Sequence, residues 1–224
     1  APLVKDGVEY TVEAGRPDTI TEDKLKVLEA NGATRVSVNP QTLSDSILQA
    51  VGRRHTVADF FRAYEMARKT SLVINVDLIA GLPGDTPEQF EQTMKGVTDL
   101  DPHNITVHTL YLKRAADYAE QDPSEFTKNA NDAVKMVEIS QRYCRENGYF
   151  PYYLYRQKNT VGNLENVGYA KSGFESPYNI YMMDDLQPIY GAGANAVTKT
   201  IENGKVSRVC NTKFAYNYLK EKWK

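Results

Sequence analysis

The sequence predicts an α/β protein in which about four βα units with parallel strands form a partial (β/α) barrel, followed by a C-terminal α+β segment. Two observations support this fold class. Through the first half of the chain, stretches rich in β-branched residues alternate with helical patterns at the spacing of successive βα units. Beyond Gly148 the composition changes to a tyrosine-dense stretch. Because a closed barrel of this kind has eight units, four units predict an open one.

The predicted strands are short runs rich in β-branched residues, and the first of them lies at an edge. We expect strands at residues 8–14, 35–39, 72–80 and 104–110. The strand at 8–14 has no predicted partner on its outer side. Such an edge favours association with another segment or chain, so we expect it to be covered in a longer protein.

The helices between these strands begin at recognisable N-caps. Threonines at positions 21, 56 and 86 each precede a helical pattern. Capping boxes are predicted for Thr56 with Asp59 and for Thr86 with Gln89, since an acidic or amide side chain three residues after the cap can bond back to the cap's amide.

The second half of the chain is predicted to form a separate segment. A long helix is expected at residues 123–147, ending before Gly148. Asn203 and Gly204 predict a hairpin turn, and a closing helix follows with Asn211 or Thr212 as its cap. We therefore predict two domains, a partial barrel at 1–122 and a C-terminal helical and α+β segment at 123–224.

The composition excludes several classes of function. The chain has 224 residues, 41% of them hydrophobic, and a net charge of −2 with both signs interspersed. This balance argues against a nucleic-acid-binding surface, and no apolar run is long enough to predict a membrane span. We therefore expect a cytoplasmic protein. The two cysteines and three histidines show no metal-ligand spacing, so no metal site is predicted from them.

Polar side chains gather at the predicted carboxyl ends of the parallel strands, which is where such folds bind ligands. They are Glu13, Asn39, Gln41, Asp77 and His108. Carboxylates suit ribose hydroxyls or an ammonium group because they accept charge-assisted hydrogen bonds. Nearby, Arg53 can hold a carboxylate through two parallel hydrogen bonds. An amino acid joined to a nucleoside would satisfy this set.

A metal-dependent site is the alternative that this spacing leaves open. Glu13, Asp77 and His108 together could hold a divalent ion. The chain would then be a lyase or aldolase-like barrel, and activity with added Mg²⁺ or Mn²⁺ would favour that interpretation.

The order of several segments resembles the oxygen-independent coproporphyrinogen III oxidase family of radical S-adenosylmethionine (SAM) proteins. The segments include EAGRPDTIT, RVSVNPQT, INVDLIAGLPGDT and YGAGANA. The resemblance covers nearly the whole chain. It implies a partial barrel of the radical SAM type, with the cofactor lying across the strand ends.

The resemblance also implies roles for single residues. In that family the positions that match Glu13, Gln41, Arg53 and Asp77 contact SAM. The position like Arg53 binds the carboxylate of SAM, those like Gln41 and Asp77 bind its ribose, and Ile79 lies near its adenine. No catalytic residue is implied within this chain.

The sequence departs from the family in two respects: the CxxxCxxC motif that binds the 4Fe-4S cluster is absent, and so is the glycine-rich turn after the second strand. The resemblance therefore implies a C-terminal fragment, inactive by itself, whose parent cleaves SAM reductively. The parent would decarboxylate propionate side chains of coproporphyrinogen III, and its electron donor is not identified. Relatives with the same core that bind or transfer haem suggest the alternative function, for which the aromatic run from Tyr149 to Tyr155 is equally suited.

Overall fold

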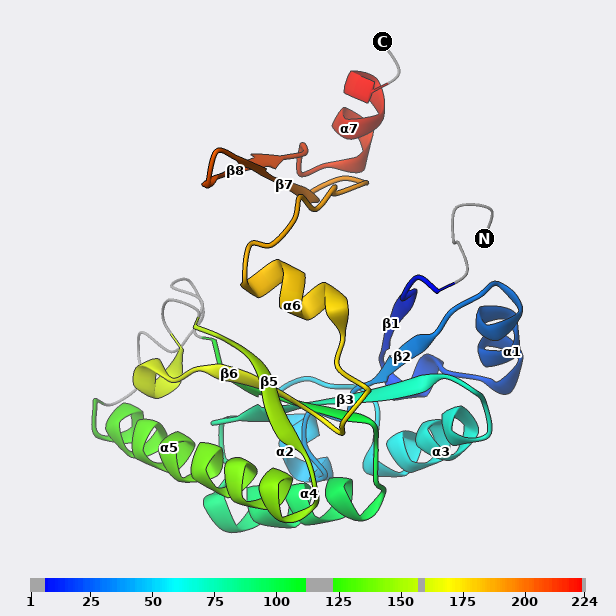
Figure 1. Cartoon of the computed structure of the whole chain (residues 1–224). Helices are drawn as coiled ribbons and strands as arrows, with labels where there is room; N and C mark the ends of the chain where they lie inside the picture. The colour runs from blue at the N-terminus through cyan, green and yellow to red at the C-terminus, as the bar shows by residue number, and fades with distance from the viewer. Residues whose placement is uncertain (1–6, 112–122, 157–159, 223–224) are drawn as a thin grey trace. The chain divides into compact units, whose positions relative to one another are not determined.

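The structure is a computed structural model that describes residues 7–111, 123–156 and 160–222 (Figure 1). The chain divides into two compact units, Ala1–Glu175 and Ser176–Lys224. The predicted long helix and the tyrosine-rich strands lie in the first unit, together with the βα units. The predicted division into domains between residues 122 and 123 stays a prediction.

The described part of the first unit contains a six-stranded sheet in the order β1-β2-β3-β4-β6-β5. The first four strands are parallel, which confirms the predicted βα arrangement. Next to β4, β6 and then β5 join the same sheet in antiparallel orientation, a continuation that the sequence did not reveal. The strands are β1 (Thr11–Gly15), β2 (Arg35–Val38), β3 (Val73–Ala80), β4 (Asn104–Thr109), β5 (Phe150–Tyr155) and β6 (Asn166–Ala170).

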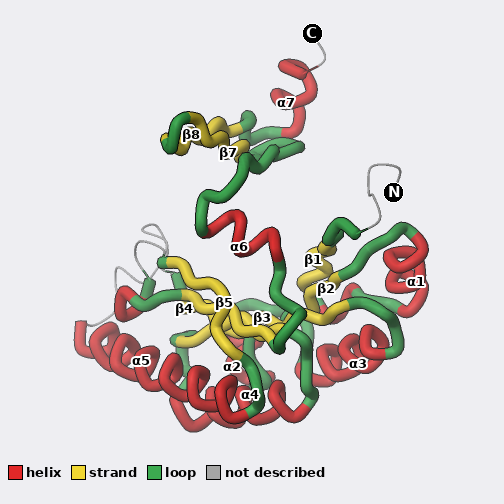
Figure 2. Tube along the Cα trace, viewed as in Figure 1, coloured by secondary structure: helices red, strands yellow, loops and turns green. Residues whose placement is uncertain are grey.

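Helices of the first unit cover one face of this sheet. In Figure 2, α3, α4 and α5 lie in a layer beneath the strands. A short helix between β2 and α3 was not predicted. The α-helices are α1 (Glu22–Ala30), α2 (Asp45–Ala50), α3 (Val57–Arg68), α4 (Pro87–Asp99) and α5 (Pro123–Glu146), and short 3-10 turns occur at η1 (Pro17–Thr19) and η3 (Val161–Asn163).

The hydrophobic core lies between the sheet and these helices. Along β3, buried residues alternate strictly with half-buried ones, as expected for a strand with one face in the core. The buried positions Val76 and Leu78 belong to the same cluster as Phe60 of α3 and Phe90 of α4. Because the side-chain period of a strand is two, the residues between them face the other side of the sheet.

The caps predicted at Thr21, Thr56 and Thr86 form in the structure, whereas the cap predicted at Asn211 or Thr212 is wrong because the closing helix begins only at Ala215. Thr21 and Thr86 each accept a hydrogen bond from the backbone amide three residues on. For Thr56 both halves of the capping box with Asp59 are present. These caps fix where the helices begin and hence the length of each loop after a strand, which is where the polar residues lie.

The second unit consists of α6 (Pro177–Met183), a hairpin of β7 (Val197–Glu202) and β8 (Lys205–Cys210), and α7 (Ala215–Lys222). Asn203 and Gly204 form the predicted turn, both with positive φ. Among the described residues, no helix is both long and apolar enough to cross a membrane.

Candidate functional site

The face of the sheet opposite the core carries polar side chains from successive strands. Asn75 and Asp77 of β3 alternate with the buried positions of that strand. Asp77 is in register with Thr106 of β4, and Ile79 is in register with His108. The sequence placed Asn39, Asp77 and His108 at one mouth, and the structure brings them together.

Asp77 lies at the centre of this face and is held by amides on both sides. The Nδ2 group of Asn39 donates to Asp77 Oδ2 at 2.7 Å, and that of Asn75 donates to Asp77 Oδ1 at 2.7 Å. The carboxylate side chain remains 18% exposed. Each oxygen therefore has an acceptor position left for a ligand hydroxyl or ammonium group.

His108 and two tyrosines of β5 continue the polar face beyond β3. The Nε2 atom of His108 lies 3.8 Å from Asp77 Oδ2, and its Nδ1 atom lies 3.2 Å from the hydroxyl of Tyr155. The hydroxyl of Tyr153 lies 3.4 Å from Thr106 Oγ1. Through His108, Asp77 is thus connected to Tyr155 of β5, a strand that is distant from β3 in the sequence.

Glu13 lies on β1, and its carboxyl is influenced by the charges of Asp77 and His108. Burial raises the pKa of the Glu13 carboxyl, and the negative charge of Asp77 adds to this shift. A cationic or hydrogen-bond-donating ligand placed between Glu13 and Asp77 would relieve their repulsion.

A pocket of about 370 Å³ beside this face brings together three further predicted residues, Gln41, Arg53 and Ile79. Gln41 has a positive φ of 70°. Its amide donates to Asp77 O at 3.1 Å, and its carbonyl accepts from Ile79 N at 2.9 Å. These bonds fix Gln41 beside β3. The pocket therefore has polar side chains from Gln41 and Arg53 and an apolar one from Ile79. Its other lining residues are Ala50, Val51, Leu82, Pro83 and Leu110.

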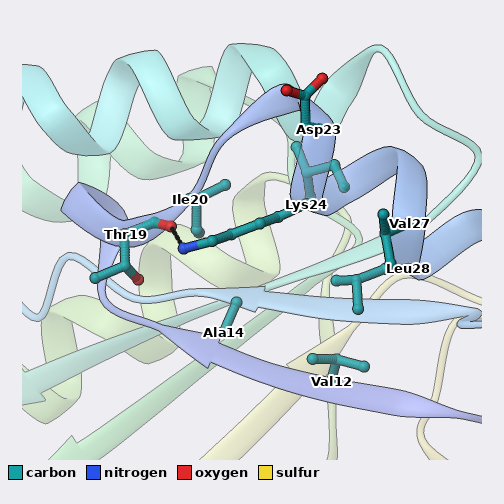
Figure 3. A pocket seen from close by; sticks show the side chains of 9 residues that line it. Val12, Ala14, Thr19, Ile20, Asp23, Lys24, Val27 and Leu28 are labelled. Carbon is teal, nitrogen blue, oxygen red and sulfur yellow. Dashed lines mark hydrogen bonds between the residues drawn. The ribbon is translucent and has the colours of Figure 1, made fainter.

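A second cavity, of about 420 Å³, lies elsewhere and is almost wholly apolar. Figure 3 shows that Val12 and Ala14 of β1 face Val27 and Leu28 of α1 across it. Lys24 only crosses its rim, donating to Thr19 O at 2.7 Å. Although this cavity is larger, none of the polar strand-end residues line it, so we do not assign the chemistry to it. It borders β1, which has no partner on its outer side among the described residues.

The metal-dependent alternative finds no support in the geometry. Within the described ranges, no group of three or more His, Cys, Asp or Glu side chains is arranged to hold a metal ion. Glu13, Asp77 and His108 share a face without forming such a group.

The sequence analysis missed Asn75 and Thr106, and it named Tyr153 and Tyr155 only as part of an aromatic run without assigning them to this site. Asn75 could have been found, because it precedes Asp77 by two positions and therefore shares its face. The tyrosines could not be assigned to this face, because their strand reaches β4 only through β6, which follows both in the sequence.

The sequence matches one family model and several curated proteins. Residues 3–97 match the sequence model of the radical SAM superfamily. The chain is 43% identical over 97% of its length to the oxygen-independent coproporphyrinogen-III oxidase-like protein HemZ of Bacillus subtilis, and covers 44% of that protein. It is 29% identical over 88% of its length to the heme chaperone HemW of B. subtilis, covering 51% of it.

A solved structure shows the same fold. The structure of coproporphyrinogen III oxidase (HemN) from Escherichia coli, described as a radical SAM enzyme, matches 96% of this chain and 48% of its own with a TM-score of 0.67. At 20% identity, this likeness shows the fold alone. The chain thus spans about half the length of the relatives that it matches.

Proposed function

Because the chain belongs, through residues 3–97, to the radical SAM superfamily, we propose that it forms one half of a coproporphyrinogen III oxidase-like radical SAM protein. One observation carries the proposal. The pocket that contains Gln41, Arg53 and Ile79 lies at the carboxyl ends of the parallel strands, and the backbone amide of Gln41 donates to the backbone carbonyl of Asp77. A cytoplasmic location belongs to the same proposal.

The residues of this pocket and of the neighbouring polar face suit SAM. Arg53 would bind the amino acid carboxylate in a bidentate manner, and Asp77 would accept from ribose hydroxyls. Gln41 would add a polar contact to the ribose, Ile79 would pack on the adenine, and Glu13 would contact the cofactor from β1. When bound, SAM supplies the group that removes a hydrogen atom from the substrate, while these residues orient it and restrict water.

The cysteines of this chain do not suit an iron–sulfur cluster. Cys144 is fully buried on α5, and burial raises the pKa of its thiol. Cys210 is exposed in the second unit. Neither can share a cluster with the other ligands such a site needs, so the cluster of the longer protein would be bound by residues outside this chain. By itself the chain would catalyse nothing.

The proposed reaction acts on the propionate side chains of coproporphyrinogen III. Converting each propionate to a vinyl group releases CO₂, one hydrogen atom and one electron. SAM accounts for the hydrogen atom, and an acceptor of unassigned identity would take the electron.

A role in haem binding is the second candidate, because the HemW protein of B. subtilis, described as a heme chaperone, is 29% identical over 88% of this chain. Titration of the complete protein with haem separates the two. A chaperone would bind haem stoichiometrically and leave coproporphyrinogen III unchanged.

Anaerobic reconstitution of the complete gene product tests the proposal. With iron, sulfide, SAM and a reductant, we expect 5′-deoxyadenosine and methionine, together with vinyl products from coproporphyrinogen III. If SAM is cleaved and the porphyrinogen is unchanged, the oxidase assignment is wrong. As a control, the double variant Cys144→Ala/Cys210→Ala should bind as much iron and sulfide as the wild type.

A further inference from the structure

The two tyrosines of β5 form an aromatic edge to the polar face. The rings of Tyr153 and Tyr155 are parallel within 3°, with centroids 6.4 Å apart. Gly168 of β6 makes room for the first of them, since a Cβ there would lie 1.8 Å from the Tyr153 ring. Both hydroxyls consequently reach across β6 to side chains of β4.

The hydrogen positions differ between the two tyrosines. Thr106 donates its single hydroxyl hydrogen to Asn75 Oδ1, at 3.3 Å. The hydroxyl of Tyr153 must therefore donate to Thr106, and its hydrogen is not available to a ligand. This chain of bonds runs toward Asp77, to which Asn75 donates.

The hydrogen of Tyr155 is not fixed in the same way, because its partner is an imidazole nitrogen that can either accept or donate. The Nε2 atom of His108 faces Asp77, which favours a hydrogen on that nitrogen. When Nδ1 also carries a hydrogen, His108 donates to the Tyr155 oxygen, and the phenol hydrogen points to a ligand.

The charges on the face are therefore divided. Carboxylates of Glu13 and Asp77 lie on one side, and a phenol donor lies on the other. Burial, with the negative charge of Asp77, raises the pKa of Tyr155, so its hydroxyl stays protonated at neutral pH. The β1–β3 side suits hydroxyls and cations, whereas the β5 side suits an anionic acceptor such as a carboxylate.

We propose that Tyr155 donates a hydrogen bond to one of the two substrate propionates that the reaction removes, and that His108 is the positioning residue that directs this donor. The inference rests on the proposed function, since it assigns a substrate contact within the same site. It places the reacting side chain next to Asp77, where SAM would lie.

Binding of two porphyrins tests the assignment of Tyr155. Coproporphyrin III keeps four propionates, whereas mesoporphyrin IX has ethyl groups in place of the two that the reaction removes. In the complete protein we expect Tyr155→Phe to weaken binding of coproporphyrin III about tenfold or more, as loss of a hydrogen bond to a charged group does. Binding of mesoporphyrin IX should change less than twofold. Fluorescence titration measures both.

A matched control lies on the opposite side of the sheet. Tyr143 of α5 donates from its hydroxyl to Glu91 at 3.3 Å, so Tyr143→Phe removes a comparable hydrogen bond away from the polar face. It should leave both affinities unchanged. Equal losses for the two porphyrins in Tyr155→Phe, or no loss for either, would overturn the assignment.

Two variants separate positioning by His108 from a structural role. His108→Gln keeps a donor and an acceptor, and should retain the preference for coproporphyrin III, whereas His108→Leu should abolish it. SAM affinity and thermal unfolding serve to show that the site is intact. If Leu and Gln behave alike, His108 has no positioning role.

The same titration distinguishes a failure of the proposed function from a failure of the roles assigned to Tyr155 and His108. A wild-type protein that binds neither porphyrin would overturn the substrate class and this inference together. A wild-type protein that prefers coproporphyrin III, with variants that keep the same preference, would overturn only the roles of Tyr155 and His108.

Discussion

Asn39 and Asp77 hold each other through hydrogen bonds in both directions. Asn39 Nδ2 donates to Asp77 Oδ2 at 2.7 Å, and the backbone amide of Asp77 donates to Asn39 Oδ1 at 3.1 Å. Asn39 is only 6% exposed, so water cannot readily replace either bond. The pair fixes the carboxylate that is proposed to bind the ribose.

Asn39→Asp should therefore destabilise the protein. The substitution keeps the acceptor for the Asp77 amide but turns the donor into a second carboxylate facing Asp77. We expect the free energy of unfolding to fall by about 2–3 kcal/mol near neutral pH. Near pH 5 the loss should be smaller, because protonating one carboxyl restores a donor. Urea unfolding at both pH values measures this. Gln49→Glu, an exposed change of the same kind, should cost less than about 0.5 kcal/mol.

Gly168→Ala should displace the Tyr153 ring. The new methyl would lie 1.8 Å from the ring, so the side chain must leave its place beside Thr106. We expect a loss of about 1–3 kcal/mol in the free energy of unfolding. In a Tyr153→Leu background the same change should cost markedly less, since a smaller side chain can move aside. A double-mutant cycle measures the difference. Equal costs in both backgrounds would show that the ring is not the obstacle.

The parallel strands could be predicted because each carries its own local signal. The predicted stretches at 35–39 and 72–80 contain β2 and β3, which are buried on at least one face and bounded by turn residues. The short helix α2 lacks such a signal, because Ser44 makes no side-chain cap bond and the helix spans only six residues.

The site was predictable only in the part that the parallel strands β1–β4 carry. Glu13, Gln41 and Asp77 follow from the rule that polar residues at strand ends meet at one edge. The contact between His108 and Tyr155 depends on β5 reaching β4 through β6. This non-local, antiparallel pairing leaves no mark in either local sequence, so the donor side of the face emerges only from the structure.

Asp85 should give the stability a distinct pH dependence. Burial raises the pKa of its carboxyl from 3.8 to about 6, and its Oδ2 atom has no hydrogen-bond partner in the described structure. Between about pH 4 and 6 the folded state therefore binds more protons than the unfolded state, and stability falls as pH rises. We expect this fall to be about 1–2 kcal/mol.

Asp85→Asn removes this titration while keeping an oxygen to accept from the Thr86 amide. The variant should be about 1 kcal/mol more stable than the wild type near pH 7, with the advantage lost near pH 4. Chemical unfolding at the two pH values measures it. Asp23→Asn, with a side chain 96% exposed, should follow the wild type. An Asp85→Asn advantage that does not change with pH would contradict this explanation.

Arg53→Lys should weaken SAM binding through the loss of a bidentate contact. Arg53 lines the pocket with Gln41 and Ile79, and its backbone amide is fixed by Leu48 O at 2.8 Å. A lysine keeps the charge but cannot pair both carboxylate oxygens in parallel, so we expect about a tenfold loss of affinity. The affinity for 5′-methylthioadenosine, which lacks the carboxylate, should stay unchanged. Arg54→Lys, its exposed neighbour, serves as the control and should alter neither affinity. Calorimetric titration of the complete protein measures both ligands, and parallel losses for the two would show that Arg53 shapes the pocket without binding the carboxylate.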